Sequence, residues 1–285
     1  MILLTGATGF LGEFVLEELV KRGHEVTCFV RKTSNLDKIK RLNVKYVYGE
    51  LDDYMSICTA LKGKEALINI ASLGFGHAPN IVNACEEMGV KRSVFVSTTG
   101  IFTKLNPDSK GVRLEAEKLI KESGLDYTII RPTMIYGTPD DRNMWRLVKY
   151  LKRLPVLPIL GSGTYLQQPV YVKDLANVIV NAYEKNVSIK KAYNVSGAKP
   201  LTYNEVVNIT GKALGKKVIR IHIPIQVSYN LLKLYEKVSK KPKLKAEQVL
   251  RLNENKDFSY EDAKNDLGYN PLSFEEGIKL EVSER

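Results

Sequence analysis

Short, almost wholly apolar runs alternate with longer amphipathic stretches along the first half of the chain. The apolar runs, rich in β-branched and aromatic residues, predict buried strands; they are MILLTG, EVTCFV, VKYVYG, EALINIA, SVFVST and YTIIRP. Stretches between them repeat apolar residues near the helical period, as in GFLGEFVLEELVKRG, SICTALKG, PNIVNACEEMGV and GVRLEAEKLIKESG. This alternation predicts right-handed crossovers and a parallel sheet covered on both faces, which is an α/β fold of the Rossmann-type, doubly wound class.

The pattern changes after Gly137. The stretch LKRLPVLPILGSG ends the alternation, and helical patterns then dominate: VKDLANVIVNAYEK, TYNEVVNITGKALG, IQVSYNLLKLYEKV, SYEDAKNDLG and SFEEGIKLEV. Short strands are expected at QPVYV, KAYNVSG and VIRIHIP. We therefore expect a Rossmann domain over residues 1–165 and a smaller α-rich lobe over residues 166–285, with the sixth strand and the linker shared. Because open parallel sheets bind ligands at the carboxyl ends of their strands, the cleft is expected there, between the lobes.

A sequence motif at the first strand carries the most specific chemistry. In LLTGATGFLGEF, Gly6, Gly9 and Gly12 directly follow the strand and open a helix. One glycine permits the tight turn, another allows the backbone to approach a pyrophosphate, and the last allows close helix–strand packing. The phosphates then bind N–H groups at the positive helix end. A glycine-rich turn of an unrelated α/β protein is the alternative, which the flanking strand and helix disfavour. The candidate nucleotide contacts in this loop are Gly6, Thr8, Gly9, Phe10, Leu11 and Gly12.

The end of the second strand indicates which nucleotide is bound. An NAD site places a carboxylate there to accept from the ribose 2′-hydroxyl, whereas this chain has Arg31 and Lys32 followed by Thr33 and Ser34. Two cations and two hydroxyls suit a 2′-phosphate. NADP(H) is therefore favoured over NAD(H), with a solvated basic loop as the alternative.

Composition and charge narrow the class of protein. Hydrophobic residues make up 44% of the chain, which is ordinary for a globular protein. No apolar run is long enough for a membrane span. MILLTG lacks the features of a signal peptide, and Cys28, Cys58 and Cys85 have neither metal nor disulfide spacing, so we expect reduced thiols, no metal and a cytoplasmic protein.

The net charge of +11 suits an anionic partner. The densest basic segment, KVSKKPKLK at residues 237–245, is interpreted as a solvated loop between helices, with a binding patch as the alternative. No nucleic-acid-binding motif is present, so no nucleic acid is expected. The expected partner is an anionic small molecule in the cleft.

Several motifs together resemble those of the extended short-chain dehydrogenase/reductase superfamily, which contains nucleotide-sugar epimerases and dehydratases. They are TGATGFLG, VSTTGIF, RPTMIYG, QPVYVKDLA and DAKNDLGYNPLSFEEGI, spread over nearly the whole chain. The resemblance implies that Thr98 matches the catalytic Ser/Thr and that Thr99-Gly100 replaces the Asp-Glu pair of the dehydratases, which argues against a dehydratase. It also implies these further cofactor contacts: Leu51, Ala71, Ser72, Ser97, Pro132 and Thr133.

The superfamily's Tyr-x-x-x-Lys motif is incomplete in this chain. An alignment on AEKLI places Ser109 at the tyrosine and Arg113 at the lysine, whereas an alignment on SK places Asn106 and Lys110 there. Both lose the tyrosine, whose proton transfer is commonly worth about 10²–10⁴-fold.

Other side chains are weaker candidates for the missing acid. His77 lies in the loop after the fourth strand, on the cleft side. Tyr165 is a candidate ligand contact, and Tyr136 is expected to pack at the base of the cleft. His24 is expected to be structural, and His222 has no assigned role.

Two functions remain open from the sequence. The first is an NADP(H)-dependent epimerase or reductase acting on an anionic substrate such as a nucleotide sugar. The second is a non-catalytic NADPH-binding regulatory or assembly protein, similar to the NmrA-like regulators and to the NADPH-binding accessory subunit of respiratory complex I. The intact small lobe favours the first and the missing tyrosine favours the second. A homodimer is compatible with either.

Overall fold

A seven-stranded parallel sheet forms the centre of the protein. The computed structural model describes residues 1–105, 108–141, 143–239 and 253–283. The strand order is β11-β6-β5-β4-β1-β2-β3, and all neighbouring strands are parallel. The strands are β1 (Ile2–Thr5), β2 (Val26–Val30), β3 (Lys45–Tyr48), β4 (Ala66–Asn69), β5 (Arg92–Val96), β6 (Asp126–Pro132) and β11 (Lys191–Val195). β1 to β4 lie within the predicted apolar runs, and β5 and β6 each begin one residue before theirs, so the doubly wound α/β prediction is confirmed. The expectation that every strand is buried is wrong for β3, which lies at the edge of the sheet with all four residues exposed.

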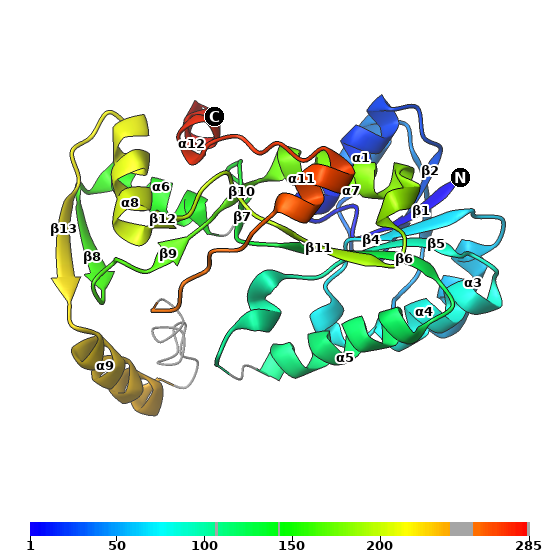
Figure 1. Ribbon diagram of the computed structural model, residues 1–285, viewed down its shortest axis with the longest axis horizontal. Helices are drawn as coiled ribbons and strands as arrows, with labels where there is room; N and C mark the ends of the chain where they lie inside the picture. Colours follow the sequence, from blue (N-terminus) through cyan, green and yellow to red (C-terminus); the bar gives the residue numbers. More distant parts are fainter. Residues whose placement is uncertain (106–107, 142, 240–252, 284–285) are drawn as a thin grey trace.

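Helices cover both faces of the sheet (Figure 1). On one face lie α1 (Phe10–Lys21) and α7 (Val172–Glu184), which pack against each other; on the other lie α3 (Tyr54–Leu61), α4 (Ala78–Glu87) and α5 (Asp108–Glu122). Successive strand residues point to opposite faces. Accordingly, Ile2 and Leu4 belong to the core under α1, whereas Leu3 belongs to the core under α4. Burial on both faces explains why β1 is apolar at consecutive positions.

A small lobe with its own core stands beside the sheet, on the left of Figure 1. Its helices are α6 (Met144–Arg153), α8 (Tyr203–Ala213), α9 (Ile225–Val238) and α12 (Phe274–Ser283). Its strand pairs are β8 (Val156–Leu160) with β13 (Ile219–Ile223) and β9 (Leu166–Gln167) with β12 (Leu201–Thr202). Leu147, Val148, Val206, Val207 and Phe274 are among the residues that fill this core.

The chain passes between the two lobes several times. Beyond residue 165, α7, β11 and α11 (Glu261–Leu267) all belong to the layers of the large lobe, and α11 packs against α7 and β11. The interpretation of KAYNVSG as a small-lobe strand is therefore wrong, because β11 pairs with β6 and buries Tyr193 and Val195 in the core under α1 and α7. β7 (Ile135–Tyr136), which follows β6, pairs in parallel with β10 (Val170–Tyr171), which directly precedes α7.

Three expectations from the sequence can be compared with the described residues: the absence of a membrane span, reduced cysteines and the absence of a metal site. No helix there is long and apolar enough to cross a bilayer. Cys28, Cys58 and Cys85 are free and buried, and the described part of the chain has no His/Cys/Asp/Glu cluster suited to a metal ion. The predicted loop at residues 237–245 lies outside the described residues from position 240 onward.

Candidate functional site

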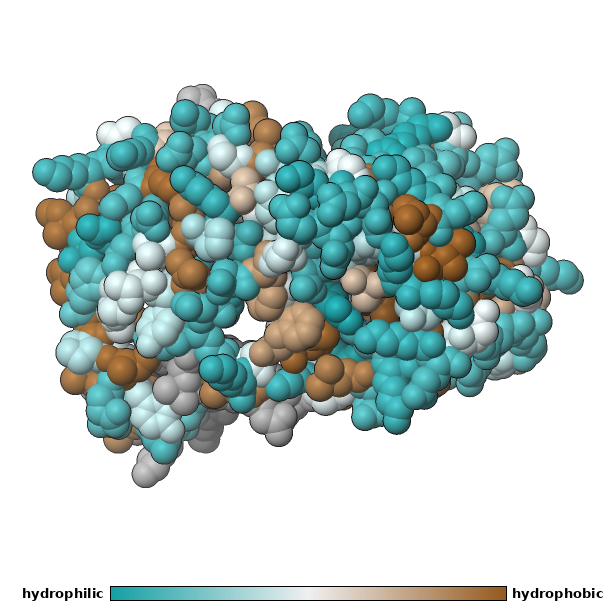
Figure 2. Space-filling model, in the orientation of Figure 1, coloured by the Kyte–Doolittle hydropathy of each residue, from teal (hydrophilic) through white to brown (hydrophobic). Residues whose placement is uncertain are grey.

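A cleft of about 1920 Å³ opens beyond the carboxyl ends of β1, β2, β4, β5 and β6. It reaches from the glycine loop after β1 to Tyr165 and residues 253–258, so it lies where the two lobes meet. Figure 2 shows a gap in the surface between the lobes. The location agrees with the expectation that an open parallel sheet binds ligands at this edge.

The three glycines of the loop differ in how much space surrounds them, and therefore in role. Gly6 has a φ of +71°, and a Cβ at that residue would lie 2.8 Å from the Ala71 nitrogen. A Cβ on Gly12 would lie 1.9 Å from the Gly6 carbonyl oxygen. A Cβ on Gly9 would meet one atom within 4 Å, the Gly6 oxygen at 3.3 Å. Gly6 and Gly12 thus serve the turn and the helix contact, while Gly9 leaves room on the cleft side.

Gly9 is also the N-cap of α1, and no side chain caps that end. The first N–H groups of a helix have no partner within the helix. They and the positive end of the helix dipole form a cradle for an anion. The residues present therefore fit the phosphates of a dinucleotide.

The segment after β2 supplies two cations to the cleft, but only one of them, Arg31, belongs to the predicted pair of Arg31 and Lys32. Arg31 and Ser34 line the cleft, whereas Lys32 is exposed and is not among the lining residues of the described chain. Lys38, from the short helix α2 (Asp37–Arg41), lines the cleft instead and forms an ion pair with Glu13. Sequence reasoning missed Lys38 because it follows the strand end by several residues.

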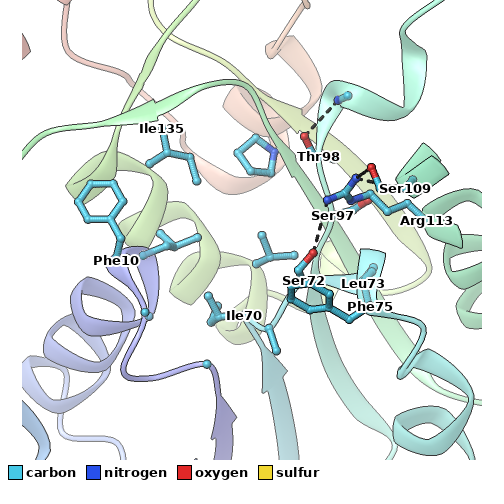
Figure 3. A pocket seen from close by; sticks show the side chains of 18 of the residues that line it. Phe10, Ile70, Ser72, Leu73, Phe75, Ser97, Thr98, Ser109, Arg113 and Ile135 are labelled. Carbon is cyan, nitrogen blue, oxygen red and sulfur yellow. Dashed lines mark hydrogen bonds between the residues drawn. The ribbon is translucent and has the colours of Figure 1, made fainter. Parts of the chain in front are cut away.

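Side chains from three strand ends line the cleft, and Figure 3 shows two of them, Ser72 and Thr98. Ser72 follows β4 and accepts a hydrogen bond from Gly74 N at 3.2 Å. Thr98 follows β5 and accepts one from Gly100 N at 3.1 Å, which caps the 3₁₀ helix η2 (Thr99–Phe102). Thr133 follows β6, and its hydroxyl donates to the Gln168 carbonyl at 2.5 Å. The predicted cofactor contacts Leu51, Ala71, Ser97 and Pro132 also line the cleft.

Ser109 and Arg113 lie side by side on α5, facing this end of the cleft (Figure 3). Arg113 Nη1 donates to Ser109 Oγ at 2.7 Å, and Arg113 Nη2 lies 3.5 Å from Ser72 Oγ. The guanidinium also lies against Gly74, where a Cβ would be 2.9 Å from Cζ. The first alignment of the motif therefore brings both of its residues together in the cleft.

The second alignment gives a different picture. Lys110 lines the cleft, but its Nζ donates to the Thr103 carbonyl at 2.6 Å and so supports the loop after β5. Asn106, its partner in that alignment, lies outside the described residues. This contact gives Lys110 a structural role.

The other histidines and tyrosines considered above differ in whether they line the cleft. His77 lines the cleft, half-buried at the N-cap of α4, with its ring centroid 6.3 Å from that of Phe75. Tyr165 also lines it. Tyr136 is 1% exposed and packs between aromatic rings of the small lobe, and burial raises its pKa far above the ordinary value. His24 is bonded to Glu184 at 2.8 Å, as expected for a structural residue. His222 contacts Asn204 at 3.0 Å and does not line the cleft.

A buried ion pair holds α5, the helix that carries Ser109 and Arg113, against β6. Glu117 of α5 is 2% exposed and accepts two hydrogen bonds from Arg131 Nε, at 3.0 and 3.1 Å, and one from Nη2 at 2.5 Å. Burial alone raises the pKa of Glu117, but the bonds from Arg131 outweigh it and hold the pKa below its usual value. The pair fixes α5 to β6, and sequence reasoning did not identify it.

Comparison with known proteins identifies the family. The sequence model of the NAD(P)H-binding family matches residues 6–185. The chain belongs to this family, within the extended short-chain dehydrogenase/reductase superfamily. The matched region contains Gly6, Gly9, Gly12, Arg31 and the ends of β4, β5 and β6 that line the cleft, and the family binds a nicotinamide nucleotide.

Three relatives show the range of proteins that this chain resembles. A 2-alkyl-3-oxoalkanoate reductase of Stenotrophomonas maltophilia (strain K279a) is 26% identical over 323 positions, covering 98% of this chain and 97% of the reductase. The mitochondrial NADH dehydrogenase [ubiquinone] 1 alpha subcomplex subunit 9 of Arabidopsis thaliana is 28% identical to this chain. The matched stretch covers 72% of this chain and 55% of that subunit. A structure of UDP-glucose 4-epimerase of Thermotoga maritima with UDP-glucose superposes with a TM-score of 0.77, at 21% identity, over 99% of this chain and 97% of the epimerase. The last likeness concerns the fold alone.

Proposed function

We propose that this protein is an NADP(H)-dependent enzyme of the epimerase or reductase type, acting on an anionic small molecule such as a nucleotide sugar. The observation that carries the proposal is the extent of the cleft. Beyond the residues suited to the nucleotide, it continues along a second wall of aromatic and basic side chains: Phe75, Phe102, Lys104, Lys110, Arg113 and Tyr165. Aromatic faces suit a base or sugar ring, and cations suit phosphates or carboxylates.

The preference for NADP(H) is supported by the charges at the end of β2. Arg31 and Lys38 provide two cations at the cleft, and Ser34 provides a hydroxyl. Arginine binds phosphate in a bidentate manner, and lysine binds it as a point charge. On NADP(H) binding, Lys38 exchanges its Glu13 partner for the 2′-phosphate in this proposal.

The chain's own residues have definable tasks beside a bound nucleotide. When bound, the nicotinamide supplies or accepts a hydride. Thr98 and Ser109 orient a substrate oxygen through their hydroxyl groups. Arg113 stabilises negative charge on that oxygen, although a guanidinium does not release its proton at working pH. His77 also lines the cleft and is the candidate for exchanging a proton with the substrate.

The alternative is a non-catalytic NADPH-binding regulatory or assembly protein. Its support is the serine at the position of the tyrosine, because a serine hydroxyl is a much weaker acid than a phenol. The similarity to the subunit of NADH dehydrogenase is in keeping with it. The free, buried cysteines support a cytoplasmic location for either function.

A substrate panel separates the two functions. The purified protein is loaded with NADPH or NADP⁺ and offered nucleotide sugars, ketones, 3-oxo acids and quinones. Nicotinamide absorbance reports oxidation or reduction, and chromatography of the products reports epimerisation. We expect turnover of one anionic class, lost in Thr98→Val. If the nucleotide binds and no compound is converted, the alternative is favoured.

A further inference from the structure

A segment near the C-terminus crosses the cleft from the small lobe. Residues 253–258, here called the strap, precede α11 and line the cleft through Asn253, Glu254, Asn255, Lys256 and Phe258. On the small-lobe side the strap pairs with β9. Leu166 N donates to Asn255 Oδ1 at 3.0 Å, and Lys256 N donates to the Leu166 carbonyl at 2.9 Å.

One side chain of the strap reaches across to the large lobe. The Glu254 carboxylate accepts a hydrogen bond from Thr103 Oγ1 at 2.5 Å and another from Lys104 N at 2.8 Å. Burial tends to raise the pKa of Glu254, but these bonds lower it below the usual value, so the group is ionised at neutral pH. Hydrogen bonds to a charged acceptor are stronger than those between neutral groups.

The segment that Glu254 holds is the wall of the candidate active site. Residues 98–104, here called the threonine loop, begin at Thr98 and contain η2. Lys110 of α5 supports the loop through the Thr103 carbonyl. Phe102 of the loop packs against Phe258 of the strap, with ring centroids 5.6 Å apart.

Arg131 of β6 completes the support of the threonine loop. Its guanidinium lies 5.4 Å from the centroid of the Phe102 ring. The loop is therefore held by α5, by β6 and by the strap. The first two belong to the large lobe, whereas the strap is paired with the small lobe, so the strap connects the two walls of the cleft.

We propose that the strap sets the position of the threonine loop according to the position of the small lobe, and that Glu254 is the positioning residue through which it acts. The proposal rests on the proposed function in one respect, namely that the cleft holds a nucleotide beside Thr98. A ligand that brings the lobes together then also fixes Thr98, and opening of the strap precedes release of the nucleotide.

Amide hydrogen exchange tests the proposal on the protein without nucleotide. Glu254→Ala removes both acceptors, Glu254→Gln keeps one acceptor oxygen, and Asp257→Asn changes an exposed carboxylate of the same strap. Losing a hydrogen bond to a charged group predicts about tenfold faster exchange throughout the threonine loop in Glu254→Ala. We expect a smaller increase in Glu254→Gln and none in Asp257→Asn, with equal melting temperatures. Acceleration confined to Lys104 and Leu105, the amides that face the lost carboxylate, overturns the proposal.

Nucleotide release provides the second measurement, by stopped-flow fluorescence of bound NADPH. We expect Glu254→Ala to release NADPH about tenfold faster than Asp257→Asn, at an unchanged association rate. Equal release rates in a wild-type protein that binds NADPH overturn the coupling while leaving the proposed function intact. If wild type binds no nucleotide, the proposed function fails, and the exchange measurement still decides the role of Glu254.

Discussion

Replacing Gly9 and Gly12 by alanine separates the binding role of the glycine loop from its structural role. At Gly12 the new Cβ would lie 1.9 Å from the Gly6 oxygen, 2.7 Å from its carbonyl carbon and 2.9 Å from Ala7 Cα. All of these are backbone atoms, so no side chain can rotate away. At Gly9 the new Cβ would lie 3.3 Å from the Gly6 oxygen, and the φ of −88° suits alanine.

The two contacts predict opposite outcomes. Relieving the Gly12 contact requires the helix or the loop to move by about 1.5 Å, and overpacking of this kind costs about 1–3 kcal/mol or more. We expect Gly12→Ala to lower the melting temperature by about 5–10 °C. Gly9→Ala should change the stability by less than about 1 kcal/mol. Its methyl group nevertheless occupies the space that the pyrophosphate needs, so we expect at least about tenfold weaker binding of NADPH.

Thermal unfolding and calorimetric titration with NADPH measure the two effects on the same samples. The expected result is that Gly9→Ala melts with wild type but binds weakly, while Gly12→Ala loses stability. Wild-type affinity in a folded Gly9→Ala protein would show that the glycine loop does not hold the phosphates. A wild-type melting temperature in Gly12→Ala would refute the packing role.

Three further substitutions test other parts of the site. Lys38→Met should weaken NADPH about tenfold and leave NADH unchanged, with Lys32→Met as the control; equal effects of the two in calorimetry would contradict the role of Lys38. Glu117→Gln should lower the unfolding free energy by about 3 kcal/mol at neutral pH because it breaks the buried pair with Arg131. Since the pKa of Glu117 is lowered by folding, its contribution is present above the ordinary glutamate pKa and is lost as the pH falls through the lowered value, so denaturation curves of the two proteins should converge in acid; a constant difference would contradict this. Ser109→Tyr places a phenol beside Arg113 and should raise turnover on any substrate that the panel identifies; unchanged turnover would show that position 109 does not face the substrate oxygen.

The fold follows from local patterns in most places. Apolar runs bounded by turn residues specify β1, β2, β4, β5 and β6, because strands buried on both faces need apolar residues at consecutive positions. β3 lies at the edge of the sheet with all four residues exposed, so its pattern carries less of this signal. β11 was assigned to the wrong lobe because a short buried strand contains no sign of its partner. Its pairing with β6 depends on the path of α7, which brings the chain back to the sheet.

The site was predictable where a single segment forms it and unpredictable where distant segments meet. The glycine loop is continuous in sequence, so its role could be inferred from spacing. Lys38 reaches the cleft because the chain turns at α2, and Glu254 meets Thr103 across 151 positions. The choice between the two alignments on α5 likewise required the helix to be placed, because the direction of each side chain depends on its rotation.

The central claim is that the cleft binds NADP(H), with Arg31 beside the 2′-phosphate. Calorimetric titration of the wild type and Arg31→Asp with NADPH and NADH tests it most directly. We predict that wild type binds NADPH at least about tenfold more tightly than NADH, and that Arg31→Asp loses this preference, because a carboxylate then faces the 2′-phosphate. Equal affinities, a preference for NADH, or a preference that survives Arg31→Asp would contradict the account.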